Sequence, residues 1–225
     1  MSSKIPYTKT EFFNNLIVDF INNEENILNF INEFPNLKNF ETIINQKSLE
    51  EINRDTLVSR LKKQNKKFKI SKETLNNINS LSSKNTFTIT TGHQLCLFTG
   101  PLYFTYKVIS CINLCQNLKE KYPKYNFVPI FWLASEDHDL NEINHFYVNN
   151  KVYTYDKANE NAPVGRLKFD KIEQFISDNL TELLQKSNDG KNLLKIFKKA
   201  YRNDKNLVDC TRFLLNELFG SYGLV

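Results

Sequence analysis

The segments TFTITTGHQLCLFTGPLY, residues 86–103, and PIFWLASEDHDLNEINH, residues 129–145, decide the fold. Residues 86–91 are β-branched or aromatic, which predicts a strand, and Gly92 is expected to break it. A helix is expected from Pro101, which suits a first helical position, to about Lys121, and residues 128–133 are expected to form a second buried strand. This order predicts a βαβ unit whose two strands are parallel.

Polar residues follow both predicted strands. Gly92-His93-Gln94 come after the first strand, and residues 136–139, Glu-Asp-His-Asp, come after the second. The carboxyl ends of parallel strands lie on one edge of a sheet, and ligands of open α/β sheets bind in the crevice beyond that edge. We therefore expect the two segments to meet over the same rim and to enclose a shared cavity.

The glycine-containing segment is suited to binding an anion. A glycine lets backbone N–H groups approach a ligand, and the helix that starts after Thr99-Gly100 presents its N-terminus to a phosphate or carboxylate. The spacing matches neither the dinucleotide fingerprint nor a phosphate-binding loop, so the ligand stays open. Tyr103 and Lys107 lie one turn apart near the helix start, and Lys107 is predicted to meet a bound anion or an acidic residue opposite. A plain surface lysine is the alternative.

Three carboxylates and an imidazole lie within residues 136–139, after an apolar strand. Carboxylates this close raise one another's pKa, so a neighbouring cation is expected to keep them ionised. Such a cluster suits the ammonium or hydroxyl groups of a substrate, a magnesium ion, or general-base catalysis on an attacking amine. The alternative is a solvated acidic turn in which Asp139 caps a helix near Asn141. His93 is predicted to be functional and His145 to be structural.

The composition is that of a globular domain. The chain has 225 residues, 40% hydrophobic residues and a formal charge of +5. Its densest lysine run, residues 62–69, is expected to be a solvated helix face, so we expect no nucleic-acid partner. No segment has the roughly 20 apolar residues of a membrane span, and residues 1–12 lack the apolar core of a signal peptide. We therefore expect a cytoplasmic protein without a membrane partner.

The four cysteines do not form the pattern of a disulfide framework and are expected to be reduced; they are Cys96, Cys111, Cys115 and Cys210. Cys111 and Cys115 lie one helical turn apart among apolar neighbours, which favours packing over metal ligation. Cys96 has no second metal ligand at a recognisable spacing. We therefore expect no metal site.

The chain is expected to have an α/β fold in three regions. Residues 1–85 are helical and pack on the core, and residues 86–148 form the first βαβ part of that core. Residues 149–225 contain a hairpin and a helical insertion that returns to a core strand. The expected helices outside the βαβ unit span residues 39–46, 49–63, 72–81, 170–184, 190–202 and 207–219.

Local signals define the ends of several elements. Ser48 lies three residues before Glu51, which predicts a capping box. Asn149-Asn150 predicts the turn of a hairpin. Residues 222–225 begin an apolar strand that is expected to continue in a longer protein, of which this chain is the front portion.

Together these residues resemble the BshC family, the cysteine ligases of bacillithiol biosynthesis. The resemblance covers the whole chain, and the family's members are longer, so it implies an N-terminal portion. His93 stands where glutamine is common in the family. The residues that match the family's motifs are Thr91–Gln94, Thr99–Tyr103, Lys107, Pro129–Trp132, Glu136–Asp139, Glu142–Asn144, Pro163–Gly165, Leu218–Gly220 and Tyr222–Val225.

The resemblance implies a Rossmann-like parallel sheet core with an N-terminal helical layer and a helical and hairpin insertion. It also implies a coiled coil beyond Val225 that supports a homodimer. The implied activity is the last step of bacillithiol biosynthesis, in which the carboxyl group of cysteine is joined to the amine of glucosaminyl malate. The family core is similar to class I aminoacyl-tRNA synthetases, whose signature histidines follow the first strand as His93 does here. ATP as a cosubstrate stays open.

Two other functions are considered beside the ligase. One is a non-catalytic nucleotide-binding Rossmann-like module, and the other is a metal-dependent hydrolase that uses the acidic cluster. For the ligase, the predicted catalytic residues are Asp137, His138, Asp139 and His93. The predicted substrate- or nucleotide-binding residues are Gly92, Gln94, Thr99, Gly100, Tyr103, Lys107, Glu136, Asn141 and Asn144.

Overall fold

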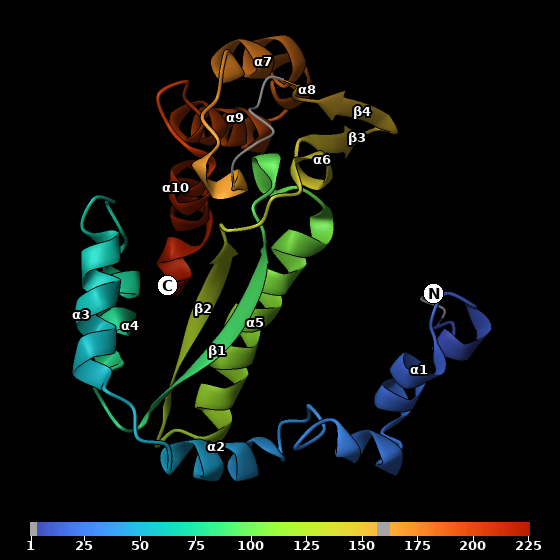
Figure 1. Cartoon of the computed structure of the whole chain (residues 1–225), viewed down its shortest axis with the longest axis vertical. Coiled ribbons are helices and arrows are strands. Elements are labelled where there is room, and N and C mark those ends of the chain that lie inside the picture. The colour runs from blue at the N-terminus through green and yellow to red at the C-terminus, as the bar shows by residue number, and fades with distance from the viewer. Residues whose placement is uncertain (1–3, 157–162) are drawn as a thin grey trace. The chain divides into compact units, whose positions relative to one another are not determined.

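The computed structural model describes residues 4–156 and 163–225, and Figure 1 shows the chain. Residues 1–3 and 157–162, which belong to the first and third regions expected from the sequence, lie outside the described residues. Contacts within the chain divide it into two units, Met1–Ile52 and Asn53–Val225. The division into three regions at residues 85 and 148 stays a prediction.

The first unit consists of short helices with little buried surface. They are η1 (Tyr7–Lys9), α1 (Asn15–Asn22), η2 (Glu25–Asn29) and α2 (Phe40–Ser48). Asn14 caps α1 by accepting the N–H of Ile17, and Asn23 ends the helix in the left-handed conformation. Of the described residues in this unit, only Ile27 and Ile44 are buried. The helix expected at residues 39–46 is confirmed as α2.

The capping box predicted at Ser48 and Glu51 is wrong. Ser48 is the last residue of α2, and its hydroxyl donates to the carbonyl of Ile44. The next helix, α3 (Arg54–Asn65), begins five residues later than expected because Asn53 caps it by accepting the N–H of Thr56. The local Ser-x-x-Glu pattern therefore lies at the end of one helix and not at the start of another.

The second unit contains the predicted βαβ core. Strands β1 (Thr86–Gln94) and β2 (Asn126–Ala134) pair in parallel, and helix α5 (Leu102–Lys121) connects them. In Figure 1 the two strands run side by side in the same direction, and α5 lies along them. The expected parallel βαβ unit is confirmed, with Pro101 as the N-cap of α5.

Gly92 does not break the first strand, which corrects the expectation from the sequence. Strand β1 continues to Gln94, and Gly92 lies opposite Trp132 in the register. A Cβ atom on Gly92 would lie 3.1 Å from both the Cβ and the carbonyl oxygen of Trp132. The missing side chain therefore allows the strands to pair closely here, and His93 and Gln94 gain fixed backbone positions at the end of a strand.

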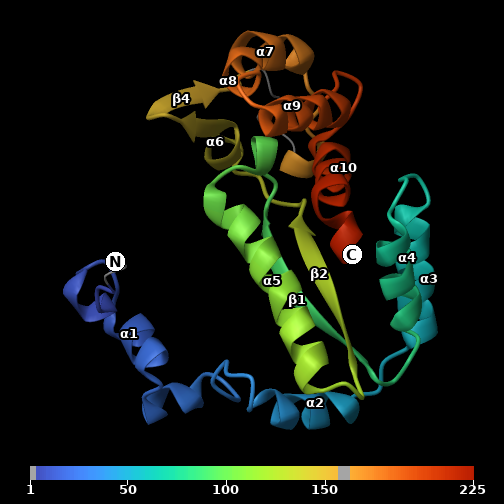
Figure 2. The ribbon, with the colours of Figure 1, turned by 180° about the vertical axis from the view of Figure 1, so that it is seen from behind.

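Helices cover both faces of the strand pair. Val128 packs with residues of α3 and α4 (Lys72–Ser80), including Val58 and Ile78. Phe131, on the other face of β2, packs with Phe104 of α5 in a cluster that includes residues of α10 (Leu207–Phe219). Figure 2 shows α5 on one side of the strands and α3 and α4 on the other. The cover is incomplete, since Thr88 and Thr90 of β1 and Trp132 of β2 remain exposed.

A hairpin follows the core. Helix α6 (Leu140–Ile143) leads into β3 (His145–Val148), which pairs in an antiparallel manner with β4 (Lys151–Thr154). The turn residues Asn149 and Asn150 have φ angles of 50° and 62°. This conformation matches the twist of the flanking strands, and asparagine tolerates it better than most residues. The predicted hairpin is therefore confirmed.

The last part of the chain is helical. It contains η4 (Val164–Arg166), α7 (Ile172–Asn179), α8 (Thr181–Leu184), α9 (Asn188–Ala200), α10 and η5 (Gly220–Tyr222). The helix expected at residues 170–184 is divided into α7 and α8, whereas α10 has the expected bounds. Val225 donates to the carbonyl of Pro129 at 3.0 Å and accepts the N–H of Phe131 at 2.8 Å. These are strand-type bonds with β2. The strand expected from residue 222 does not begin there, because Tyr222 ends η5 and Gly223 is left-handed with a φ angle of 78°.

No helix in residues 4–156 and 163–225 is long and apolar enough to cross a membrane. In the same residues, no group of three histidine, cysteine, aspartate or glutamate side chains could hold a metal ion. The four cysteines are free and buried.

We predict that Ile78→Ala destabilises the full-length protein by about 2–5 kcal/mol, because Ile78 is fully buried between α4 and the sheet and the cavity would not refill. Leu75→Ala is the matched control, since Leu75 lies on the same helix but is 41% exposed. Leu75→Ala should lower the free energy of unfolding by less than about 1 kcal/mol. Denaturant unfolding measures the stability of both variants. Equal losses of stability would mean that α4 does not pack on the sheet as described.

Candidate active site at the carboxyl ends of two parallel strands

The glycine-containing and acidic segments meet at the carboxyl ends of β1 and β2. The Gln94 side chain, at the end of β1, donates from its amide nitrogen to Asp137 and, at 2.7 Å, to Glu142. Asp137 lies in the segment that follows β2, and Glu142 lies on α6. One amide group therefore joins the two segments and holds two carboxylates close together.

Asp137 is held as a carboxylate by hydrogen bonds. One oxygen accepts from Gln94, and the other accepts the N–H groups of His138 at 2.7 Å and Asp139 at 3.2 Å. The bond from Gln94, followed by the backbone bonds, lowers the pKa of the Asp137 carboxyl below its ordinary value. The cation expected beside the cluster is not observed, since no ion pair between described residues includes Asp137.

The other residues of the acidic cluster differ in their roles. Asp139 caps α6 by accepting the N–H of Glu142 at 3.2 Å, so the capping alternative for this residue is confirmed. Glu136 is exposed and accepts the hydroxyl of Ser135 at 3.3 Å. His138 is exposed, and its imidazole has no hydrogen bond within the described part of the chain. His138 is therefore free to contact a ligand.

A segment distant in the sequence holds the backbone of residues 135–139, the acidic loop that follows β2. Val164 donates its N–H to the carbonyl of Asp137 at 2.7 Å, and Gly165 donates to the carbonyl of Ser135 at 3.0 Å. A Cβ atom on Gly165 would lie 2.5 Å from the Ser135 oxygen and 2.7 Å from Val208. Only glycine fits, so Gly165 belongs to the site although the sequence-based list of site residues lacks it. Its signal was the Pro163-Val164-Gly165 motif.

His93 has a defined tautomer in its neutral form. Its Nδ1 lies 2.9 Å from the carbonyl oxygen of Gln94, and a carbonyl can only accept, so Nδ1 carries the proton. Nε2 is then left with its lone pair. The ring lies against those of Tyr103 and Phe104, with centroid distances of 5.0 and 5.4 Å. These contacts position the imidazole beside the start of α5.

Cys96 lies next to His93, with Sγ 3.6 Å from Nδ1. Burial, and secondarily the charge of Glu142, raises the pKa of the Cys96 thiol to about 11. The group is therefore a neutral thiol and not a nucleophilic thiolate.

Lys107 does not meet an acidic residue in the structure, which corrects that part of its prediction. Its ammonium donates to the carbonyl oxygen of Gly92 at 2.7 Å. The lysine therefore connects α5 to the end of β1. Tyr103, one turn earlier, is 55% exposed and leaves its hydroxyl accessible to a ligand.

The first turn of α5 is available to an anion. Its N-cap, Pro101, makes no side-chain hydrogen bond to the helix. The N–H groups at the start of a helix carry partial positive charge. That of Phe104 already donates to the carbonyl of Pro101 at 2.9 Å, so the N–H groups of Leu102 and Tyr103 are the ones left for a ligand. Thr99 and Gly100, which lead into this turn, have φ angles of 75° and 52°.

Two predicted binding residues lie farther from the two joined segments. Asn141 is an exposed residue of α6. Asn144 ends α6, its side-chain oxygen lies 3.2 Å from Nδ1 of His145, and its carbonyl accepts the N–H of Tyr155. Among the described residues, neither side chain is hydrogen-bonded to Asp137 or His93.

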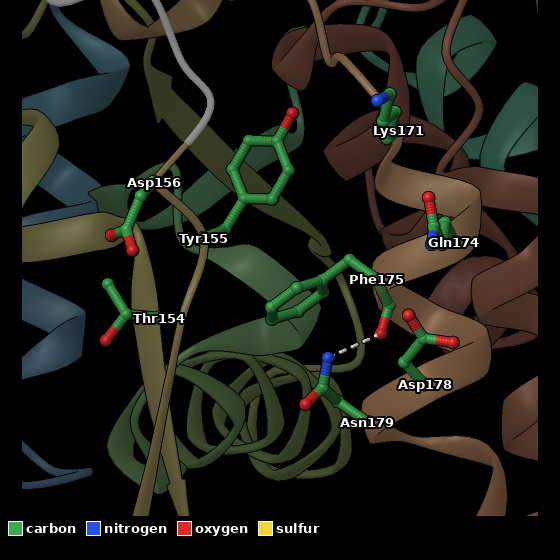
Figure 3. Close-up of a pocket in the computed structure, with 8 residues that line it drawn as sticks. All are labelled: Thr154, Tyr155, Asp156, Lys171, Gln174, Phe175, Asp178 and Asn179. Atoms are coloured by element: carbon green, nitrogen blue, oxygen red, sulfur yellow. Dashed lines mark hydrogen bonds between the residues drawn. The ribbon is translucent and has the colours of Figure 1, made fainter.

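Two hollows lie near this region. A cavity of about 210 Å³ lies between β4 and α7, and Figure 3 shows the residues that line it. A groove of about 640 Å³ runs along β2 between α3 and α10, and Trp132 and Val225 line part of it. Neither hollow is lined by His93 or Asp137. The two segments therefore meet, but these hollows are not the shared cavity expected from the sequence.

Comparisons with known proteins agree on one family. The family model described as "Bacillithiol biosynthesis BshC, N-terminal Rossmann-like domain" matches residues 1–225. A Flavobacterium psychrophilum protein named "Putative cysteine ligase BshC" is 47% identical over 224 residues, which cover 98% of this chain and 42% of the relative. Proteins of the same name from Flavobacterium johnsoniae and Bacillus cereus are 47% and 29% identical, over 98% and 93% of this chain. The chain spans 42% of the Flavobacterium relatives and 40% of the Bacillus relative.

We predict that Gln94→Leu raises the pKa of Asp137 toward the ordinary aspartate value, because the donors favour the charged form and Gln94 contributes most. NMR titration of the carboxyl carbon measures this shift. Asn141→Ala, which changes an exposed residue of α6, is the control and should leave this pKa unchanged. An unchanged pKa in Gln94→Leu would show that the amide does not stabilise the carboxylate.

We also predict that Gly165→Ala destabilises the full-length protein by about 1–3 kcal/mol, because the added methyl group overlaps the Ser135 carbonyl and Val208. Gly220→Ala is the milder control, since its nearest neighbour is the Asn216 side chain at 3.0 Å. Thermal unfolding should rank the two variants in this order. The reverse order would contradict the close packing of Gly165 on the acidic loop.

Proposed function

The chain belongs to the family of N-terminal Rossmann-like domains of BshC, a bacillithiol biosynthesis family, and on this premise we propose that it forms the substrate site of a cysteine ligase. The proposed ligase joins the carboxyl group of cysteine to the amine of glucosaminyl malate through an amide bond, as the last step of bacillithiol biosynthesis. The relatives that the chain matches are named as cysteine ligases, which supports the reaction class.

The observation that carries this proposal is the bridge from Gln94 to Asp137 and Glu142 beside the uncapped start of α5. The bridge holds two carboxylates close together, and the helix start offers N–H groups. Carboxylates suit an amine that arrives as an ammonium ion, and helix N–H groups suit a carboxylate or phosphate. An amide-forming ligase has to bring these two kinds of group together.

Proton removal is the second requirement, because only a neutral amine attacks a carboxyl carbon. Asp137 is a weak base, since hydrogen bonds to both of its oxygens favour the ionised form and lower its pKa. We assign it to binding the ammonium group. The exposed imidazole of His138 and Nε2 of His93 are the groups that we assign to accepting the proton. Glu136 and Tyr103 would orient the substrates.

Joining a carboxylate to an amine also requires one carboxylate oxygen to leave. We propose ATP as the cosubstrate: phosphoryl or adenylyl transfer to this oxygen would form a mixed anhydride, and attack by the amine would break its C–O bond and release the oxygen with phosphate or AMP. The N–H groups of Leu102 and Tyr103 in the first turn of α5, preceded by Thr99 and Gly100, would hold a phosphate.

The proposal extends to the whole protein, because this chain spans 42% of the Flavobacterium relatives. We propose a homodimer joined through a coiled coil beyond Val225, and a cytoplasmic location. The four free cysteines support a reducing compartment.

A nucleotide-binding module without catalysis is the second candidate. The uncapped start of α5 at the carboxyl edge of parallel strands favours it, because this is where Rossmann-like domains bind phosphates. Such a module would be stabilised by ATP or ADP but would form no product from cysteine and glucosaminyl malate.

We predict that the full-length protein with cysteine, glucosaminyl malate and ATP forms the amide product, detected by mass spectrometry. Asp137→Ala combined with His138→Ala should lower the rate by at least about a hundredfold, the usual contribution of a general base. Glu120→Ala, near the far end of α5, is the control and should keep the rate. Full activity in the double variant would refute the site assignment, and nucleotide-dependent stabilisation without product would favour the non-catalytic module.

A further inference from the structure

The turn between β1 and α5 has a strained backbone. Three successive residues have positive φ angles: Phe98 at 52°, Thr99 at 75° and Gly100 at 52°. Left-handed backbone is unfavourable for residues with a side chain, and for a β-branched threonine it is a clear outlier. Such conformations persist only where their surroundings enforce them. The turn therefore depends on contacts from elsewhere in the fold.

Aromatic packing supplies part of that support. Phe98 is 7% exposed, and its ring lies against those of Tyr201, Phe197 and Phe146, with centroid distances of 4.4, 5.1 and 5.4 Å. Cys96 fills the space above Gly100, where a Cβ atom would lie 2.3 Å from the Cys96 Cβ. Packing holds the Phe98 side chain and excludes other residues at Gly100.

One hydrogen bond holds the backbone itself. The N–H of Phe98 donates to the hydroxyl oxygen of Tyr201 at 2.8 Å, across 103 positions of sequence. Tyr201 is fully buried and follows directly after α9. A buried N–H without a partner is costly, so the hydroxyl favours the left-handed conformation over alternatives that would turn this N–H away.

The turn also determines where α5 begins relative to His93. Thr99 and Gly100 lead through Pro101 into the first turn of α5, and Tyr103 in that turn lies against the His93 ring. If the turn took an unstrained conformation, the first N–H groups of α5 and the Tyr103 ring that packs against His93 would move together.

We infer that Tyr201 is a positioning residue, whose hydroxyl holds the strained Phe98–Gly100 turn and thereby places the start of α5 for substrate. The inference rests on the proposed function, which supplies the substrate. The fold provides a matched comparison in Tyr155, whose hydroxyl bonds to the backbone of Asp170 at 2.7 Å within the same buried cluster and, among the described residues, makes no hydrogen bond to the turn. Figure 3 shows Tyr155 beside Phe175.

The experiment compares Tyr201→Phe with Tyr155→Phe in the full-length protein. Amide hydrogen exchange by mass spectrometry over residues 95–101 should speed up by about tenfold in Tyr201→Phe, the scale of one lost hydrogen bond, and stay at the wild-type rate in Tyr155→Phe. Both variants keep their rings, and circular dichroism checks that they fold. Equal exchange of this segment in the two variants would overturn the inference.

Kinetics test the positioning role. Tyr201→Phe should raise the KM for a substrate by several-fold and leave kcat within about twofold of wild type, because the reacting groups themselves are unchanged. Tyr155→Phe should change neither constant. Faster exchange with unchanged KM would overturn the positioning role. If the wild-type protein forms no product, the proposed function fails, while the exchange comparison still decides whether Tyr201 holds the turn.

Discussion

The parallel pairing of β1 with β2 determines where the chemically distinctive residues of this chain lie. Because the strands run in the same direction, the segments that follow them emerge at one edge, and the Gln94 amide can reach both Asp137 and Glu142. An antiparallel pair would place these segments at opposite ends of the sheet. The close approach of Gly92 to Trp132 maintains the pairing to the last residue of both strands.

The helical part of the second unit supports the site. Val164 and Gly165 fix the acidic loop through its backbone, and Tyr201 holds the turn before α5. Both supports come from residues far along the sequence from the strands. The residues after β4 therefore do more than cover the core, because they determine the geometry of loops that β1 and β2 only position roughly.

The sequence predicted what depends on local pattern. The two strands, α5, the hairpin at Asn149-Asn150 and α10 follow from periodicity and turn residues, and all are present. Features that depend on a distant partner were missed. Gly92 breaks a strand by local rules but pairs closely with Trp132, and the role of Gly165 depends on Ser135 and Val208.

The candidate site shows the same limit. The meeting of the two segments followed from parallel topology, and the cap formed by Asp139 followed from its place before α6. The partner of Lys107 could not be predicted, because its ammonium donates to the backbone carbonyl of Gly92, whose position depends on the folded chain, and not to a carboxylate. The ionisation of Asp137 depends on donors whose directions only the folded backbone sets.

The bond between Phe98 and Tyr201 also has a consequence for synthesis on the ribosome. The two residues are 103 positions apart, so at about 5–20 residues per second the partner emerges roughly 5–20 s after the turn it stabilises. β1 is already made when this interval begins, and α5 and β2 are made during it, but the left-handed turn still lacks its anchor. The geometry of this turn therefore cannot be completed before Tyr201, the residue after α9, has been made.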